Sequence, residues 1–175
     1  MGLQFAEKTE FLKIKIYAKI NRQYKIFFPA KTLNGKSGFR LASILQTIEN
    51  ENILIDEGWY DQDKHQYFLK NDKIFSKEII GYIRFPRVAK LFTPKNNFTT
   101  NEWYTYNLKE IEKFLGIKIN QKYFIKNMSS LNETFLVPSE LTPTFRNNHL
   151  QYAITWFVMS FAFFVLFLVY LKKNK

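Results

Sequence analysis

The chain has 175 residues, a formal net charge of +11 and no cysteine. The absence of cysteine excludes a disulfide framework and any thiolate metal site. A basic chain can meet anionic lipid or nucleic acid, but the lysines are dispersed and no recognised nucleic-acid motif occurs, so we expect no nucleic-acid partner.

The first part of the chain has the pattern of β structure. Residues 11–20, FLKIKIYAKI, alternate apolar and polar side chains, which predicts a half-buried strand. A second apolar run at 24–28 follows after a short polar break, so the two runs could form a hairpin. The dipeptide Asn34-Gly35 predicts a turn after them.

Three further strands are predicted downstream, at 53–59, 78–85 and 122–126. The stretch between the first two of them, residues 61–76, is polar and turn-like. We therefore expect a mainly β fold of the α+β class, an antiparallel β-barrel-like or sheet domain with about six or seven strands.

One short helix is predicted at 108–115. Asn107 can cap its N-terminus, and Glu110 can reach back to the N–H of that cap. Apolar side chains recur at three- and four-residue steps between the caps, and Gly116 is a natural stop.

A long apolar stretch follows near the C-terminus. From Tyr152 to Leu171 there are about 20 residues without a charge, enough to cross a hydrocarbon core of about 30 Å. We expect a soluble β-rich domain at 1–137, a linker at 138–150, a transmembrane helix at 151–171 and a tail at 172–175. The lipid bilayer is therefore an expected partner.

The charges beside this helix predict its orientation. Lys172, Lys173 and Lys175 follow it, so the positive-inside rule places the tail in the cytoplasm or matrix. The β-rich domain would then lie on the periplasmic or intermembrane-space side. The N-terminal residues contain no apolar segment that would carry the domain across, so charge and export signal disagree. The alternative is a tail-anchored topology, with the domain inside and the lysines outside.

No sequence pattern points to catalysis, and we expect no enzymatic activity. The two histidines, His65 and His149, lie in no serine or cysteine nucleophile motif, and neither a Gly-rich phosphate loop nor HExxH occurs. The acidic residues between 56 and 63 fit a solvated loop better than a catalytic pair. His65 fits an exposed position in a polar loop.

His149 differs, because on a helix it shares one face with Tyr152 and Trp156. An imidazole at the head of an aromatic face in a membrane could ligate a haem iron, whose macrocycle needs flat apolar walls. The alternative is an interfacial anchor, with Tyr152 and Trp156 as ordinary belt residues. Residue chemistry alone favours the anchor.

Five segments, in order, resemble the Surfeit locus protein 1 family, whose members are assembly factors for cytochrome c oxidase. The segments are NGKSGFRLASILQT, ILIDEGW, EIIGYIRFP, FTPKNNFTTNEWYTYNLKEIEKFLG and NNHLQYAITWF. The last is similar to the start of the family's second transmembrane helix. The resemblance extends over nearly the whole chain.

The resemblance implies a place, a partner and a cofactor. It implies two transmembrane helices around a domain in the periplasm or intermembrane space, in the bacterial inner membrane or the mitochondrial inner membrane. It implies haem a binding through His149, with Tyr152 and Trp156 lining the site, and assistance in inserting haem a into oxidase subunit I. Gly58 and Trp59 fall on family motif positions, with Gly58 allowing a tight strand end and Trp59 buried beneath it.

Two departures from the family pattern leave alternatives open. The family usually has a basic residue before Gly-Trp, where this chain has Glu57, and the expected first transmembrane helix is missing. A misassigned start, a split gene or an inactive N-terminally truncated copy would each explain the missing helix. A rival hypothesis is a membrane-tethered interaction module that stabilises subunit I without binding haem.

Overall fold

The computed structural model describes residues 10–86, 93–131, 133–140 and 149–174. It divides into two compact units, Met1–Leu141 and Thr142–Lys175, which are considered separately below. The predicted start of the linker lies in the described part of the first unit, whereas residues 1–9 and most of the linker lie outside the described residues. The predicted ranges 1–137 and 138–150 stay predictions.

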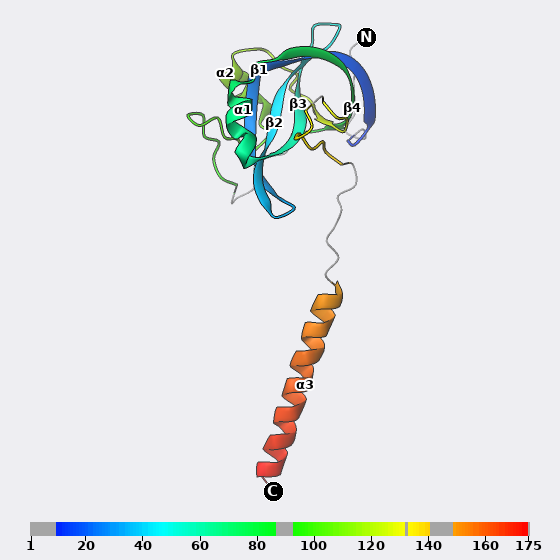
Figure 1. Ribbon diagram of the computed structural model, residues 1–175, viewed down its shortest axis with the longest axis vertical. Helices are drawn as coiled ribbons and strands as arrows, with labels where there is room; N and C mark the ends of the chain where they lie inside the picture. The colour runs from blue at the N-terminus through cyan, green and yellow to red at the C-terminus, as the bar shows by residue number, and fades with distance from the viewer. Residues whose placement is uncertain (1–9, 87–92, 132, 141–148, 175) are drawn as a thin grey trace. The chain divides into compact units, whose positions relative to one another are not determined.

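The first unit is a barrel of five named strands (Figure 1). They are β1 (Lys13–Leu33), β2 (Lys36–Gln46), β3 (Asn52–Asp61), β4 (Ile74–Arg84) and β5 (Phe124–Asn127). Their pairings close on themselves in the order β1-β2-β3-β5-β4. All pairs are antiparallel except the short parallel contact of β3 with β5. The predicted fold class, mainly β and barrel-like, is confirmed.

β1 is a single long strand that closes the barrel. The prediction of a hairpin within it is wrong. One strand of 21 residues contains both predicted runs, 11–20 and 24–28, except that residues 11 and 12 precede it. Its first half pairs with β4 and its second half with β2. The pairing with β2 shifts register between Asn21 and Ile26, and this irregularity is the polar break that looked like a turn. One long strand in place of two lowers the expected strand number.

A bulge in β3 also changes which side chains point inward. Leu41 of β2 pairs with Gly58, but the next residue, Ala42, pairs with Asp56, so Glu57 is the extra residue. Ile55 points into the barrel before the bulge, and Tyr60 joins the same interior cluster after it. Alternation alone would place these two on opposite faces.

The segment 61–76, expected to be turn-like, contains a 3-10 turn at Gln62–Lys64, a helix α1 (His65–Lys70) and the start of β4. The fully buried side chain of Phe68 fixes α1 to the barrel, with its ring 4.4 Å from that of Tyr60. Six helical residues are too few to show a helical period in the sequence.

Helix α2 (Leu108–Leu115) is the short helix expected from the sequence, and it lies on the outside of the barrel. The Asn107 side chain accepts from the N–H of Glu110, and Gly116 ends the helix in the left-handed conformation, at φ +69°. A second cluster of buried side chains fills the space beneath it. These are Ile26, Phe28, Ala42, Ile44, Leu54, Trp103, Leu108, Ile111, Ile119 and Phe124.

Gly58 has two reasons to be glycine. Its φ is +145°, where other residues are strained, and a Cβ there would lie 2.4 Å from the carbonyl oxygen of Val137. Gly35 has a φ of +80°, but a Cβ there would meet nothing within 4 Å.

We expect Gly58→Ala to lower the free energy of unfolding by about 3 kcal/mol and Gly35→Ala by about 1 kcal/mol. Only the first change forces two backbone segments apart. Denaturant unfolding of the full chain in non-ionic detergent measures both. Equal losses for the two variants would show that the backbone approach at Gly58 does not matter.

Candidate functional site

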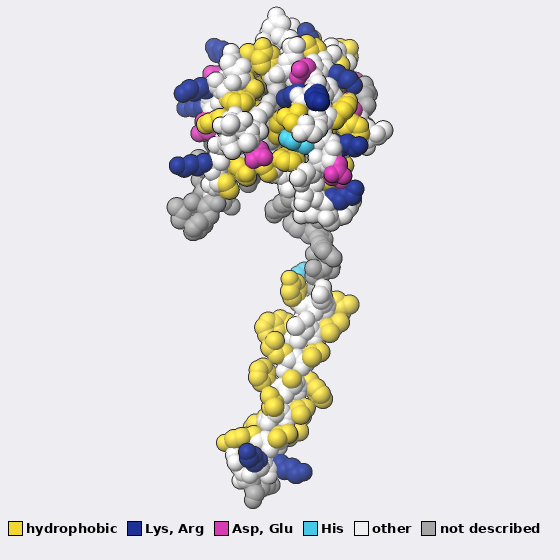
Figure 2. Space-filling model, turned by 60° about the vertical axis from the view of Figure 1, so that its left-hand side comes forward, with side chains coloured by type: hydrophobic (Ala, Val, Ile, Leu, Met, Phe, Trp, Pro, Cys, Tyr) yellow, Lys and Arg dark blue, Asp and Glu magenta, His cyan; other side chains and the backbone are white. Residues whose placement is uncertain are grey.

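Helix α3 (His149–Lys173) is long and apolar enough to cross a membrane. Its most apolar window has a mean hydropathy of 2.4, and none of that window is buried. Hydrophobic side chains cover the helix along its length, and basic side chains follow at its end (Figure 2). No other helix among the described residues meets the same length and composition.

The helical conformation places His149, Tyr152 and Trp156 on one face of α3, as the spacing predicted. The side chains of Tyr152 and Trp156 are 64% and 67% exposed. Thr155, one residue before Trp156, donates its hydroxyl to the carbonyl of Gln151 at 2.9 Å, so it is satisfied within the helix. Thr155 therefore adds no free hydroxyl beside the aromatic face that contains Tyr152 and Trp156.

Gly58 and Trp59 lie in the other unit, where a segment that we call the strap (residues 133–140) crosses β3. Trp59 and Val137 exchange both backbone hydrogen bonds, each at 2.7 Å. Trp59 is half-buried rather than fully buried, and its ring lies against Gly38 of the neighbouring strand β2. The absence of a side chain at Gly58 thus allows the strap to approach β3 closely.

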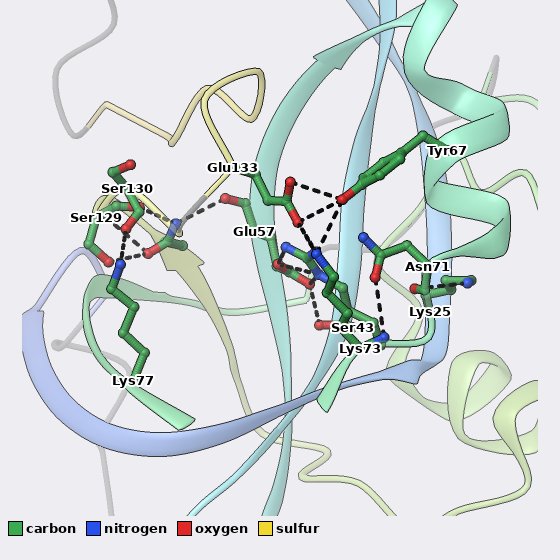
Figure 3. A network of polar contacts seen from close by, with 12 residues as sticks. Lys25, Ser43, Glu57, Tyr67, Asn71, Lys73, Lys77, Ser129, Ser130 and Glu133 are labelled. Carbon is green, nitrogen blue, oxygen red and sulfur yellow. Dashed lines mark hydrogen bonds and ion pairs between the residues drawn. The ribbon is translucent and has the colours of Figure 1, made fainter. Parts of the chain in front are cut away.

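A buried ion pair inside the barrel was not foreseen. Arg22 is fully buried and donates from Nε and Nη2 to the carboxylate of Glu57, which is also fully buried, the shortest contact being 2.8 Å. Ser43 donates its hydroxyl to Glu57 at 2.6 Å (Figure 3). Arg22 also donates from Nη1 to Glu133 of the strap at 3.0 Å.

This network stabilises the charge on Arg22. Burial alone would lower the pKa of the guanidinium, but attraction and hydrogen bonds from Glu57, followed by those from Glu133, outweigh it, so the pKa lies above its ordinary value. Tyr67 donates to both oxygens of Glu133 at 3.1 Å, which completes the pairing of that carboxylate. The strap is therefore fixed to the barrel by a buried charge.

A second network lies on the outer face, beneath α2. Asp56 is fully buried and accepts from Arg40 Nε at 2.8 Å and from Tyr106 OH at 2.7 Å, and it forms an ion pair with Lys126, whose Nζ lies 3.3 Å away. Burial would raise the pKa of this carboxyl, but the two cations together with the hydrogen bonds hold it below its ordinary value. The ring of Tyr106 stacks on Phe28 and Phe124, with centroids 4.1 and 4.3 Å away.

The structure corrects the expected solvated loop at 56–63. Asp56 and Glu57 are strand residues without solvent exposure, whereas Asp63 is exposed. Each of the two buried carboxylates meets an arginine that lies far from it in sequence, Arg40 and Arg22. Long-range pairs of this kind leave no local pattern. The sequence offered one signal, the position of each residue in its strand. Arg22 and Glu57 both fall where the alternation of their strand places an inward-facing side chain.

His65 is also not the exposed loop histidine that we expected. It begins α1 and is half-buried, with its ring stacked on Phe39 at 4.4 Å. Its Nδ1 lies 2.9 Å from the hydroxyl of Tyr60. Burial lowers the pKa of His65, against a smaller opposing effect of Glu102. Among the described residues, no group of three or more histidine, aspartate or glutamate side chains could hold a metal ion.

The architecture defines a class of protein: a small β-barrel domain in a chain that also carries a candidate membrane-spanning helix. The family follows from comparison. The SURF1 family profile matches residues 2–161, so the chain belongs to the SURF1 family, known for assembly factors of cytochrome c oxidase. The resemblance found in the sequence is thereby confirmed.

Individual relatives agree with this assignment. A SURF1-like protein of Rickettsia conorii is 28% identical over 166 residues, which cover 92% of this chain and 69% of that protein. One from Rickettsia prowazekii is 31% identical over 140 residues, 77% of this chain and 57% of that protein. The human Surfeit locus protein 1 is 30% identical over 86 residues, 49% of this chain and 28% of that protein.

We expect Glu57→Gln to lower the free energy of unfolding by about 3–5 kcal/mol, because it leaves the charge of Arg22 buried with less compensation. The control is Glu78→Gln, which removes the partner of Lys15 from a pair whose side chains are 54% and 64% exposed. That variant should unfold at nearly the wild-type denaturant concentration. A Glu57→Gln variant as stable as the control would show that the buried pair contributes little.

Asp56 should make stability depend on pH. Its folded pKa lies below the model-compound value of 3.8, so the unfolded chain binds a proton first as pH falls. The contribution of Asp56 is therefore complete above about pH 5 and is lost as pH falls through 3.8 toward the folded pKa. The stability difference between wild type and Asp56→Asn should narrow over that range.

Unfolding measured by tryptophan fluorescence at a series of pH values checks this. Asp63→Asn, which changes an exposed carboxylate, is the control and should differ little from wild type at any of them. A difference between wild type and Asp56→Asn that stays constant down to pH 3 would contradict the depressed pKa.

Proposed function

We propose that this protein is a membrane-anchored assembly factor for cytochrome c oxidase that binds haem a and assists its insertion into subunit I. Membership of the SURF1 family supports the assembly role. The apolar helix α3 supports attachment to a membrane, in the bacterial or mitochondrial inner membrane. The basic last turn, with Lys172 and Lys173, favours the β-barrel domain on the periplasmic or intermembrane-space side.

The observation that carries the haem proposal is the exposed face of α3. His149 would supply an imidazole nitrogen to the iron, and Tyr152 and Trp156 would lie against the macrocycle. The residues fit such a group because a histidine and two exposed aromatic rings share one face of an apolar helix. Haem a supplies the redox centre of the oxidase, and the role of this chain is to hold and orient it without enzymatic turnover.

The rival function is a membrane-tethered module that stabilises subunit I without haem. In that case His149 anchors the helix at the interface through its polarity alone. The two functions differ in one respect that substitution can test. Glutamine keeps the polarity and approximate length of histidine but is a poor ligand for iron.

We expect His149→Gln to abolish co-purifying haem absorbance while membrane insertion and the folded barrel persist. The full chain, expressed in a host that makes haem a, is purified in non-ionic detergent, and its absorption spectrum and circular dichroism are recorded. His65→Gln is the matched control, because it changes the other histidine of the chain and should leave the haem content unchanged.

A second pair of variants tests the aromatic wall. Trp156→Ala should reduce haem retention severalfold without changing the axial ligand, whereas Phe161→Ala, equally exposed but on another side of α3, should not. If His149→Gln keeps haem with an unaltered spectrum, His149 is not the ligand. The tethered interaction module would then be the better description.

A further inference from the structure

Basic side chains gather around the buried carboxylate of Asp56 on the outer face of the barrel. They come from three strands of the closed sheet, Arg40 from β2, Lys126 from β5 and Arg84 from β4, and β3, which carries Asp56, lies between β2 and β5. Arg40 and Lys126 both contact Asp56, as described above. Tyr82 stands opposite Lys126 in the β4–β5 pairing, two residues before Arg84 on the same face.

The charges of this cluster do not balance. Arg40 and Lys126 share the single carboxylate of Asp56, and Arg84 pairs with Glu10 at 3.0 Å. Among the described residues, three cations therefore face two carboxylates. The surplus charge affects Lys126, whose pKa is lowered by burial, with Arg40 and Arg84 contributing to the lowering, although Asp56 opposes it.

The cluster also has hydrogen-bond donors that the described contacts do not use. The ammonium group of Lys126 has three N–H groups, and its described contacts are the ion pair with Asp56 and the ring of Tyr106, whose centroid lies 5.6 Å away. Arg40 has five N–H groups, of which Nε faces Asp56 and one on Nη2 faces the hydroxyl of Ser139, and the hydroxyl of Tyr106 also lies beside its guanidinium. The side chains of Arg40, Lys126 and Arg84 are 21%, 19% and 19% exposed, so a ligand can reach them from solvent.

We propose that Arg40, Arg84 and Lys126 form a binding site for a phosphate group with one negative charge. The charge of such a group matches the surplus of one cation. Its tetrahedral oxygens suit donors that converge from different strands, whereas a planar carboxylate suits a single guanidinium fork. Tyr82 lies opposite Lys126 in the sheet, near Ser139, and its hydroxyl adds a polar wall. The phosphodiester of a lipid headgroup and free phosphate both have this chemistry.

The site is tested on the full chain in non-ionic detergent, with inorganic phosphate as the probe. Phosphate should raise the melting temperature more than sodium chloride of equal ionic strength does, since a ligand that binds the folded state stabilises it. Lys126→Gln should weaken the apparent phosphate affinity by at least tenfold. Lys122→Gln, which removes an exposed lysine from the same part of the chain, should not.

Phosphorus NMR line broadening of the added phosphate gives a second measurement that does not depend on stability. Arg84→Gln serves as a second variant in case Lys126→Gln unfolds, and it too should lose the broadening. The absence of any effect specific to phosphate in the unsubstituted protein would overturn the proposal. Line broadening in Lys126→Gln and Arg84→Gln as strong as in the unsubstituted protein would overturn it as well.

The source of the phosphate is distinguished by competition. Short-chain phosphatidylglycerol, kept below its micelle concentration, is added to the complex with inorganic phosphate. Displacement at a concentration lower than that of the phosphate identifies a lipid headgroup as the ligand. Tighter binding of inorganic phosphate identifies a soluble phosphate. Both outcomes support the site, and failure of both probes to bind excludes it.

Discussion

The barrel depends on one buried ion pair, that of Arg22 and Glu57. Two charges inside a five-stranded barrel would be unfavourable alone, because burial removes their hydration. The bidentate contact with Glu57 and the second carboxylate of Glu133 together satisfy the guanidinium, and the hydroxyl of Ser43 donates to Glu57. Arg22 and Glu57 each lie at an irregularity in strand pairing, so the ion pair joins β1 and β3 at the points where their ladders are interrupted.

The same pair shows where the charge beside the Gly-Trp dipeptide goes. Glu57 stands directly before Gly58 and Trp59, and its charge is directed inward to Arg22. The neighbouring Asp56 points to the other face and meets Arg40. A bulged strand thus directs two consecutive carboxylates to two separate networks, one in the interior and one beneath α2.

The sequence predicted those parts of the fold that have a local pattern. Alternation located the strands, and the caps Asn107 and Gly116 located α2 to the residue. The sequence did not reveal that residues 13–33 form one strand, since a register shift and a turn both appear in a sequence as a short polar break. Likewise the helical period placed His149 and Trp156 on one face, but no period reveals what covers that face.

The ion pairs could not be predicted, because Arg22 lies 35 residues from Glu57 and 111 from Glu133. Such contacts depend on the closed barrel. The prediction for the segment 61–76 was wrong for a different reason. Its helix is held by the burial of one residue, Phe68, and a single anchor does not form a recognisable period.

The place of β5 in the sheet has a consequence for the order of folding. This strand is the last of the barrel in the chain, yet it lies between β3 and β4, which are made earlier. Until Phe124–Asn127 has been synthesised, β3 and β4 each keep an unpaired edge that could pair with another chain. The completed barrel therefore requires almost all of the first unit. A nascent chain that ends before β5 exposes two unpaired strand edges that are prone to aggregation.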